Sequence, residues 1–434
     1  MTKIIDIVKK LYPFDYSVAG NGNDQAIKVF KKYLNFKIQN FPSSKTLNGW
    51  KIPSAQRVLK AEIIHKNKKI FDGLDSPFNV ISQCKNFQGK IKGVDLLNRL
   101  FTSKECPNGI PYNWTGLYRP NQNSWGFCVK KNFLKKIKKS ENYFVNIKVN
   151  EENTPMRVLD YEIKGRSKKT IIINAHNCHK FQANDDISGC AVAINLFQDL
   201  QKRKNLNLSY RLIIAPELFG PMFWLKKIKD KKNFIGAILM KAVGNDSHLK
   251  LQKTSHANTF LDKAAKYSLS SFKDKYEVGS FRAVYGNDET VFEAPGNNIP
   301  SITFTRFPFK QYHTNLDKPD ILSNEKLEMS YKVLKKTIDI IENNYFLKNT
   351  HKGLICLSNK KYDLYKNAFA PGVDNSKYTN NQRDWNLLMN CLPMEIEKNS
   401  TILDFSNKYR LDFFDLLTYL KEWKNKKLIK FVKI

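Results

Sequence analysis

The stretch Thr170–Leu196, TIIINAHNCHKFQANDDISGCAVAINL, decides the fold predicted for this chain. It begins with an apolar, β-rich run at Ile171–Ile173, passes through a polar loop and continues as a helical pattern after Ser188. A strand, a loop and a helix in this order are typical of an open α/β sheet, in which ligands bind at the carboxyl ends of the strands. The loop carries zinc-compatible imidazole and carboxylate groups. These are His176, His179, Asp185 and Asp186.

Two further apolar runs end in the same kind of side chain. Tyr210–Ala215 is followed by Glu217 in APELFG, and Ser301–Thr305 is followed by His313 in QYHTNLDKPD. Taken alone, each histidine is an ordinary polar loop residue, and the aspartate pair could simply cap the helix that follows it. Three strand ends that each deliver a possible ligand favour a metal site over these separate explanations.

The motifs HNCHKFQANDDISG, APELFG, YGNDE with APGNNIP, and YHTNLD occur in this order along the chain. With them the sequence resembles the bacterial aminopeptidase-like proteins related to the M28 zinc peptidases, of the DUF4910 type. Weaker similarity in LYPFDYSVAGNG, IPYNW and SWGFC extends the resemblance over nearly the whole chain. The resemblance implies an α/β fold with a mostly parallel sheet flanked by helices, an inserted β-rich domain of the DUF2172 type and a C-terminal winged helix-turn-helix.

The domain boundaries expected from this resemblance leave the peptidase-like domain discontinuous. Residues 1–45 and 131–348 would form it, residues 46–130 the insertion, and residues 349–434 the winged helix-turn-helix. Strands are expected at Tyr143–Val149, Ile171–Ala175, Arg211–Ala215, Ile235–Met240 and Ser301–Thr305, and helices at Gly189–Leu200 and Leu327–Ile341. Strands that alternate with helices indicate a mainly parallel sheet covered on both faces.

The aromatic residues of the insertion and the lysines of the tail each leave two readings open. Tyr112, Trp114 and Trp125 are expected to pack in a small core, but exposed rings there could bind sugar or peptide groups. A winged helix could place its Lys-rich end against nucleic acid. Because Asp412 and Asp415 open its second helix, a structural or protein-contacting role is favoured over DNA binding.

In M28-type sites, one aspartate bridges two zinc ions, a histidine and an acidic residue complete the first site, and a glutamate and a late histidine complete the second. The resemblance carries these roles onto four residues by position, with His179 as a secondary candidate. The ligands implied in this way are His176, Asp185, Glu217 and His313.

Two departures from the family pattern matter for the chemistry. Pro216 occupies the position of the usual general base, and Lys241 lies near the position of the acidic ligand to the first metal. An ammonium group there would repel a cation, so one zinc is expected rather than two. A zinc-bound water would still need a base. Glu217 could serve if it does not bind the metal; otherwise Asp186, Asp288 or Glu289 would supply it, although the last two could also be solvated loop residues.

Composition narrows the setting of this site. The 434 residues allow two or three domains, and the formal charge of +33 could indicate a polyanionic partner. Lysine is spread along the whole chain, however, so biased composition is favoured over a dedicated surface. Seven cysteines without compact spacing argue against a secreted disulfide framework. The amino terminus lacks a signal-peptide pattern and no run is long enough to span a bilayer, so we expect a cytoplasmic protein without a membrane partner.

Three hypotheses for function follow. The first is a mononuclear zinc hydrolase of the aminopeptidase type that acts on a peptide or an amide-bearing small molecule. The second is a non-catalytic or weakly catalytic metal-binding or interaction module, because the usual base is missing. The third is a zinc-dependent acyl or aminoacyl transferase. The family resemblance also suggests a link to modified polysaccharide biosynthesis, and the sequence leaves the oligomeric state open.

Overall fold

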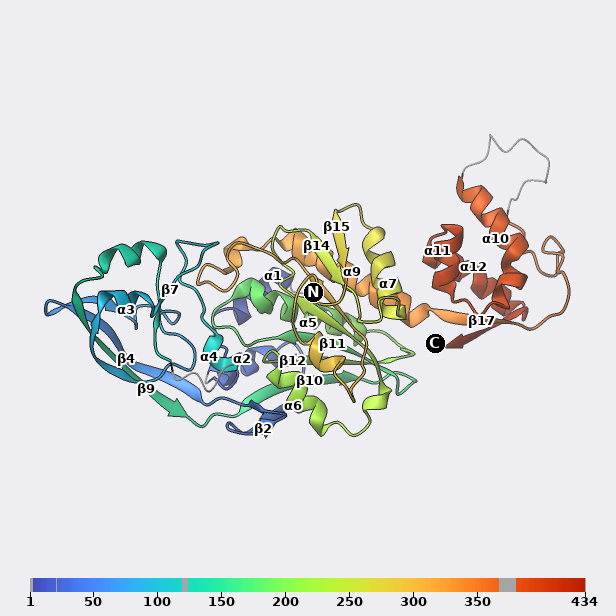
Figure 1. Cartoon of the computed structure of the whole chain (residues 1–434). Coiled ribbons are helices and arrows are strands. Elements are labelled where there is room, and N and C mark those ends of the chain that lie inside the picture. Colours follow the sequence, from blue (N-terminus) through green and yellow to red (C-terminus); the bar gives the residue numbers. More distant parts are fainter. Residues whose placement is uncertain (1–2, 21, 119–123, 367–379, 434) are drawn as a thin grey trace. The chain divides into compact units, whose positions relative to one another are not determined.

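The computed structural model describes residues 3–20, 22–118, 124–366 and 380–433. These residues form two compact units, Met1–Lys335 and Lys336–Ile434. Figure 1 labels many of the elements of both units. The sequence Gly20-Asn21-Gly22 predicts a turn after the first helix, but Asn21 lies outside the described residues.

An eight-stranded sheet forms the centre of the larger unit, with the strand order β1-β10-β12-β11-β13-β16-β14-β15. Among its described strands, four neighbouring pairs are parallel and three are antiparallel. The strands are β1 (Lys37–Phe41), β10 (Met156–Ile163), β11 (Thr170–His176), β12 (Ser209–Ala215), β13 (Phe234–Lys241), β14 (Leu249–Gln252), β15 (Tyr276–Gly279) and β16 (Ser301–Thr305). The predicted fold class, a mostly parallel sheet flanked by helices, is confirmed.

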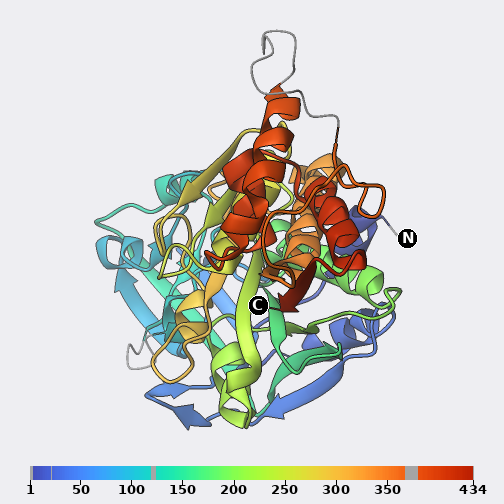
Figure 2. The same ribbon diagram turned by 90° about the vertical axis from the view of Figure 1, so that its right-hand side faces the viewer.

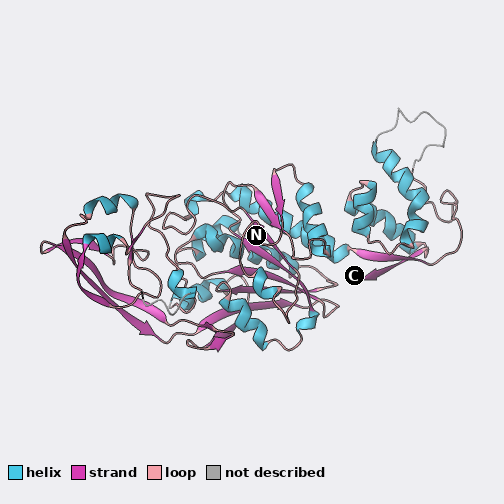
Figure 3. Ribbon diagram, viewed as in Figure 1, coloured by secondary structure: helices cyan, strands magenta, loops and turns pink. Residues whose placement is uncertain are grey.

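The central strands are largely apolar because helices cover both faces of the sheet. Every residue of β11 is buried, as expected for a strand that has no solvated face. Ile172 and Ile213 pack in one hydrophobic cluster with Phe223 and Trp224 of helix α6 (Phe219–Lys227). Helix α5 (Gly189–Leu200) lies on the opposite side of the sheet (Figures 1 and 3).

Most of the predicted central elements form where the sequence pattern placed them. Strands β11, β12, β13 and β16, and helices α5 and α9, confirm those predictions. The remaining helices of the larger unit, with α9 at its end, are α1 (Ile4–Leu11), α2 (Gly22–Phe30), α3 (Gly93–Leu97), α4 (Thr115–Tyr118), α7 (Phe260–Ser270), α8 (Glu289–Phe292) and α9 (Asn324–Asn343).

One strand belongs to a different sheet from the one expected. The strand predicted at Tyr143–Val149 forms as β9 (Asn142–Glu152), but it pairs with β4 (Ala55–His65) and β6 (Phe87–Lys92). Its assignment to the large sheet was therefore wrong. Apolar alternation identifies a strand but not its partner, and the side chains of Val145 and Ile147 enter the core of the β-rich part instead.

The β-rich part is built on an antiparallel sheet with the order β5-β4-β9-β6, in which β5 is Lys68–Asp72. Its core is a separate hydrophobic cluster that includes Phe127 and Trp125. The short strands β7 (Leu100–Phe101) and β8 (Phe127–Cys128) pair beside this core. The hairpin of β2 (Thr46–Leu47) and β3 (Trp50–Lys51) instead packs Leu47 and Trp50 against the hydrophobic cluster of the large sheet. The domain boundaries at residues 45, 130 and 348 stay predictions.

The boundary between the units lies within α9, so the smaller unit begins with the last turns of that helix. Within its described residues it adds three further helices and a pair of antiparallel strands, and these three helices lie together in Figure 2. Asp412 caps the last helix by accepting hydrogen bonds from the N–H groups of Phe414 and Asp415. The elements are β17 (Tyr345–Asn349), α10 (Asn380–Ile396), α11 (Ile402–Tyr409), α12 (Phe413–Asn425) and β18 (Ile429–Lys433). The winged helix itself stays a prediction.

None of the helices in the described ranges combines the length and the apolar character that a bilayer crossing requires.

Candidate metal centre

Parallel strands of the large sheet bring the predicted site residues to one edge. His176 ends β11 and is paired with Ala215, two residues before Glu217. Lys241 ends β13 and is paired with Thr305, the last residue of β16. Because these carboxyl ends lie side by side, side chains far apart in the sequence meet there.

The loop between β11 and α5 is held in place by an aspartate that the sequence analysis did not select. The carboxylate of Asp317 accepts hydrogen bonds from the N–H groups of Asn184 and Asp185, at 2.7 and 2.9 Å. Ser188 donates to the carbonyl oxygen of Asn184 at 2.7 Å. Asp317 is the last residue of the YHTNLD motif, so the motif could have identified it from the sequence.

Asp185 lies at the centre of the cluster. Its Oδ2 atom is 3.0 Å from Nε2 of His313 and 3.5 Å from Nδ1 of His179, and its Oδ1 atom is 3.6 Å from Nε2 of His176. Asp185 and His176 are fully buried. Three imidazoles therefore face one buried carboxylate.

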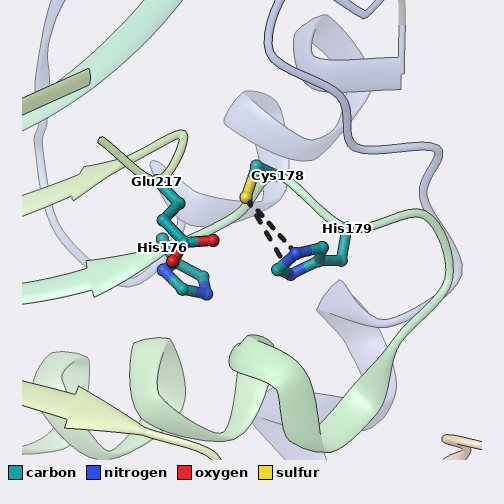
Figure 4. Close-up of side chains that lie close together, drawn as sticks. All are labelled: His176, Cys178, His179 and Glu217. Carbon is teal, nitrogen blue, oxygen red and sulfur yellow. Dashed lines mark hydrogen bonds between the residues drawn. The ribbon is translucent and has the colours of Figure 1, made fainter. Parts of the chain in front are cut away.

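Glu217 approaches the same histidines from the end of β12. Single donor atoms of His176, Cys178, His179 and Glu217 lie within 4.8 Å of one another, and Figure 4 shows these side chains facing a common space. Asn287 donates to Oε1 of Glu217 and lies with its side-chain nitrogen 3.3 Å from Nδ1 of His176. The amide thereby positions both groups, and the sequence analysis had not selected it.

His179 takes a larger part than its secondary place in the sequence analysis suggested. It belongs to the cluster with Glu217 and also to a second group with Asp185 and His313. His176 also contacts Asp186 closely, in a third group with Asp185. Each of the four residues predicted as ligands belongs to at least one of these three groups, and His179 links the group that holds Glu217 to the group that holds Asp185 and His313. The ligand set itself stays a prediction.

Lys241 occupies the side of the site where the resemblance placed a first metal. Its Nζ atom is 3.2 Å from Oδ2 of Asp186 and 3.8 Å from Oδ2 of Asp288, and all three side chains are buried. The other oxygen of Asp186 accepts a hydrogen bond from the N–H of Ala242 at 2.7 Å. A buried ammonium group between two carboxylates neutralises charge that a second cation would otherwise need to balance.

The two remaining candidates for a base are partly engaged. Oδ1 of Asp288 accepts a hydrogen bond from the N–H of Leu218 at 2.6 Å. Oε1 of Glu289 accepts from Arg282 at 3.0 Å and from the N–H of Asn287 at 2.9 Å. Glu289 therefore faces Arg282, whereas Asp288 faces Lys241 and the site.

Burial dominates the electrostatics of the cluster. It raises the pKa of Glu217 to about 8, although His176 opposes this shift. It lowers the pKa of His179 to about 3, against the attraction of Asp185. Burial is the largest single influence on the pKa of His176 and would lower it, but Asp186, Cys178 and Asp185 together outweigh burial and hold that pKa well above its usual value.

A segment of the β-rich part closes over the cluster. The N–H of Tyr112 donates to the carbonyl oxygen of His313 at 2.7 Å. The Tyr112 ring stands edge-on to the rings of His179 and His313, with centroids 5.5 and 5.8 Å apart. Of the three aromatic residues considered in the sequence analysis, Tyr112 and Trp125 are buried, while Trp114 is 40% exposed with its ring centroid 6.4 Å from that of His313.

Comparison with known proteins agrees with this architecture. The DUF4910 profile, described as a domain of unknown function, matches residues 5–344. The chain belongs to the DUF4910 family. That membership confirms the family resemblance drawn from the motifs.

Three similar proteins extend the comparison. A Clostridium acetobutylicum protein, named as a candidate polysaccharide biosynthesis protein with an aminopeptidase-like domain, is 27% identical over 346 residues, which cover 79% of this chain and 78% of that protein. A candidate peptidase crystal structure from the same organism has a TM-score of 0.82 at 22% identity and covers 99% of this chain and 96% of the other. The zinc aminopeptidase BSAP from Bacillus subtilis has a TM-score of 0.57 at 13% identity over 77% of this chain and 93% of its own. At these identities the two crystal structures establish the shared fold.

Proposed function

We propose that this protein is a mononuclear zinc hydrolase of the aminopeptidase type, acting on an amide bond. The observation that supports it most strongly is a set of buried imidazole nitrogens and carboxylate oxygens that face one another at 3.0 to 3.6 Å but meet hydrogen-bond geometry with none of the described residues. Both carboxylate oxygens of Asp185 and the Nε2 atoms of His176 and His313 belong to this set. Buried polar atoms are almost always satisfied, and carboxylate oxygens with imidazole nitrogens form the donor set that zinc prefers.

Asp185, Glu217 and His313 would hold the metal, with His176 and His179 alongside them as alternative imidazole donors. Zinc bound there would polarise a carbonyl group and make a bound water more acidic. The donor chemistry fits this ion because three carboxylate or imidazole ligands leave a position open for water or substrate. The ammonium group of Lys241 supports one metal rather than two.

The protein's own groups would orient the reactants. Asn287 fixes the carboxylate of Glu217, and Asp288 presents its second oxygen, which makes no hydrogen bond within the described residues, toward Lys241. Asp288 is therefore our first choice for a proton acceptor if Glu217 binds the metal, since Glu289 is turned toward Arg282. Trp114 would lie beside the incoming substrate because it is exposed next to His313.

The substrate proposed is a peptide or an amide-bearing small molecule. The name of the Clostridium acetobutylicum relative, which couples polysaccharide biosynthesis to an aminopeptidase-like domain, favours an amide carried by a sugar. Acylated amino sugars and aminoacyl amides are therefore the two substrate sets to compare.

Zinc stoichiometry and turnover test the proposal together. Elemental analysis of the purified protein should give close to one zinc per chain, and the metal-loaded protein should hydrolyse at least one of the two substrate sets. His313→Ala should abolish both, whereas His256→Ala, which changes an exposed histidine outside the cluster, should leave both intact. Tight zinc that persists in His313→Ala would contradict the ligand assignment.

A second function, a binding module without hydrolysis, is favoured by Pro216, which leaves no carboxylate at the usual position of the base. Tight zinc with no turnover of either substrate set, and with retained binding of an acylated amino sugar, would support it.

A further inference from the structure

A cavity of about 360 Å³ lies in the larger unit, beside the metal centre. Its walls come from the N-terminal segment at residues 15–20 with Gly22, the start of β4, the loop at residues 73–83 and Tyr112. Small-molecule sites in proteins usually measure about 300 to 1,000 Å³. The cavity therefore has the size of a site for one small group.

The cavity shares a wall with the metal centre. Tyr112 lines it while its ring contacts the rings of His179 and His313, and its hydroxyl group makes a hydrogen bond with Ser82, another lining residue. Lys180, which directly follows His179, also lines the cavity. A group bound in the cavity would lie across one tyrosine ring from the candidate ligands.

The lining is rich in hydrogen-bonding groups whose positions are fixed. The side-chain nitrogen of Gln56 donates to the carbonyl oxygen of Cys84 at 3.1 Å, and that of Gln83 donates to the carbonyl oxygen of Ser54 at 3.0 Å. Such a lining suits a ligand that carries several hydroxyl groups. Because the amide side chains are already held in place, they lose little conformational freedom when the ligand binds. The lining hydroxyl groups belong to Ser17, Ser54, Ser76 and Ser82.

The charges of the lining add a preference for an anion. Lys180 and Asp15 face each other at 3.6 Å, so their charges largely offset one another. Arg57, an exposed residue of β4, is the remaining charged residue of the lining, and its side chain takes part in no ion pair or hydrogen bond with any residue that the structure describes. A guanidinium fork binds carboxylate or phosphate through two parallel hydrogen bonds.

We propose that this cavity is a subsite for a hydroxyl-bearing group with a negative charge, such as an acidic or phosphorylated sugar. This inference rests on the proposed function in one point: the bound group is taken to be part of the same molecule whose amide reaches the metal centre. The β-rich part thereby contributes to substrate selection, since it supplies Arg57, Gln56 and most of the lining serines.

Calorimetric titration of the zinc-free full-length protein tests the subsite without any turnover. Glucuronate and glucose 6-phosphate are the anionic probes, and glucose is the neutral one. We expect one anionic probe to bind, roughly tenfold more tightly than glucose because of the charge-assisted hydrogen bonds. Which of the two binds more tightly distinguishes a carboxylate from a phosphate.

Two variants and a control separate the cavity from the general positive charge of the protein. Arg57→Ala should reduce binding of the anionic probe to the level of glucose, and Ser54→Phe should abolish it by filling the cavity without changing the charge. Lys68→Ala, at an exposed residue outside the lining, should leave it unchanged. The subsite would be overturned if the wild type, Arg57→Ala and Ser54→Phe bound the anionic probe with equal affinity. It would also be overturned if no probe bound when present at a 20-fold molar excess over about 1 mM protein.

The outcomes also keep the subsite distinct from the proposed hydrolase. Arg57-dependent binding without hydrolysis of any amide would retain the subsite and refute the proposed function. Hydrolysis of amides together with binding that does not depend on Arg57 would refute the subsite and retain the function.

Discussion

Replacing Lys241 by methionine is the sharpest test of how the site balances its charge. The ammonium group lies 3.2 Å from Asp186 and 3.8 Å from Asp288, and none of the three side chains is exposed. At an effective dielectric constant of about 20, two unit charges at the Lys241–Asp186 distance attract each other by about 5 kcal/mol. Removing one partner of a buried pair costs about 3–5 kcal/mol because the other charge stays buried.

We therefore expect Lys241→Met to lower the free energy of unfolding of the metal-free protein by about 3 kcal/mol. Urea denaturation followed by tryptophan fluorescence measures this change. Because two carboxylates then lack a cation, added zinc should stabilise the variant more than the wild type. The zinc content measured by elemental analysis should rise from one toward two ions per chain.

The matched control is Lys250→Met, which removes an ammonium group from a partly exposed pair with Glu277 on the same sheet. Its effect should be much smaller, since solvent screens such pairs. If Lys241→Met unfolds at the wild-type urea concentration and binds no additional zinc, the electrostatic role assigned to Lys241 is wrong.

Three other substitutions test the positioning of a metal ligand, the contact with substrate and the stability of the large sheet. Asp317→Ala removes the acceptor of the Asp185 N–H, so zinc affinity measured against a competing chelator should fall by about 10- to 100-fold; an unchanged affinity would remove its positioning role. Trp114→Ala should raise KM more than it lowers kcat, because the exposed ring lies next to His313 without belonging to the metal cluster; a loss confined to kcat would argue against substrate contact. Asp160→Asn removes the negative charge of the carboxylate that accepts two hydrogen bonds from Arg211, so urea denaturation should show a free energy of unfolding lower by about 3 kcal/mol. A stability equal to that of the wild type would contradict this estimate.

The central strands and the candidate ligands could be predicted because both depend on short-range signals. Ile171–Ile173 is a continuous apolar run, as a strand buried on both faces requires. His176, Glu217 and His313 each follow such a run, and the carboxyl ends of parallel strands must meet at one edge. The strand at Asn142–Glu152 was recognised for the same reason, yet its sheet was not, because alternation carries no information about the partner strand.

What the sequence determined by itself was the set of elements and the chemical kinds of side chain at their ends. Only the tertiary structure decided which of those groups face one another: His179 joins the cluster, Asn287 and Asp317 position it, and Lys241 fills one side of it. The physical reason is that contacts between residues from different strands and loops depend on how the sheet twists and how its loops fold back. The hydrophobic pattern along the chain records burial and period, and it leaves those long-range directions open.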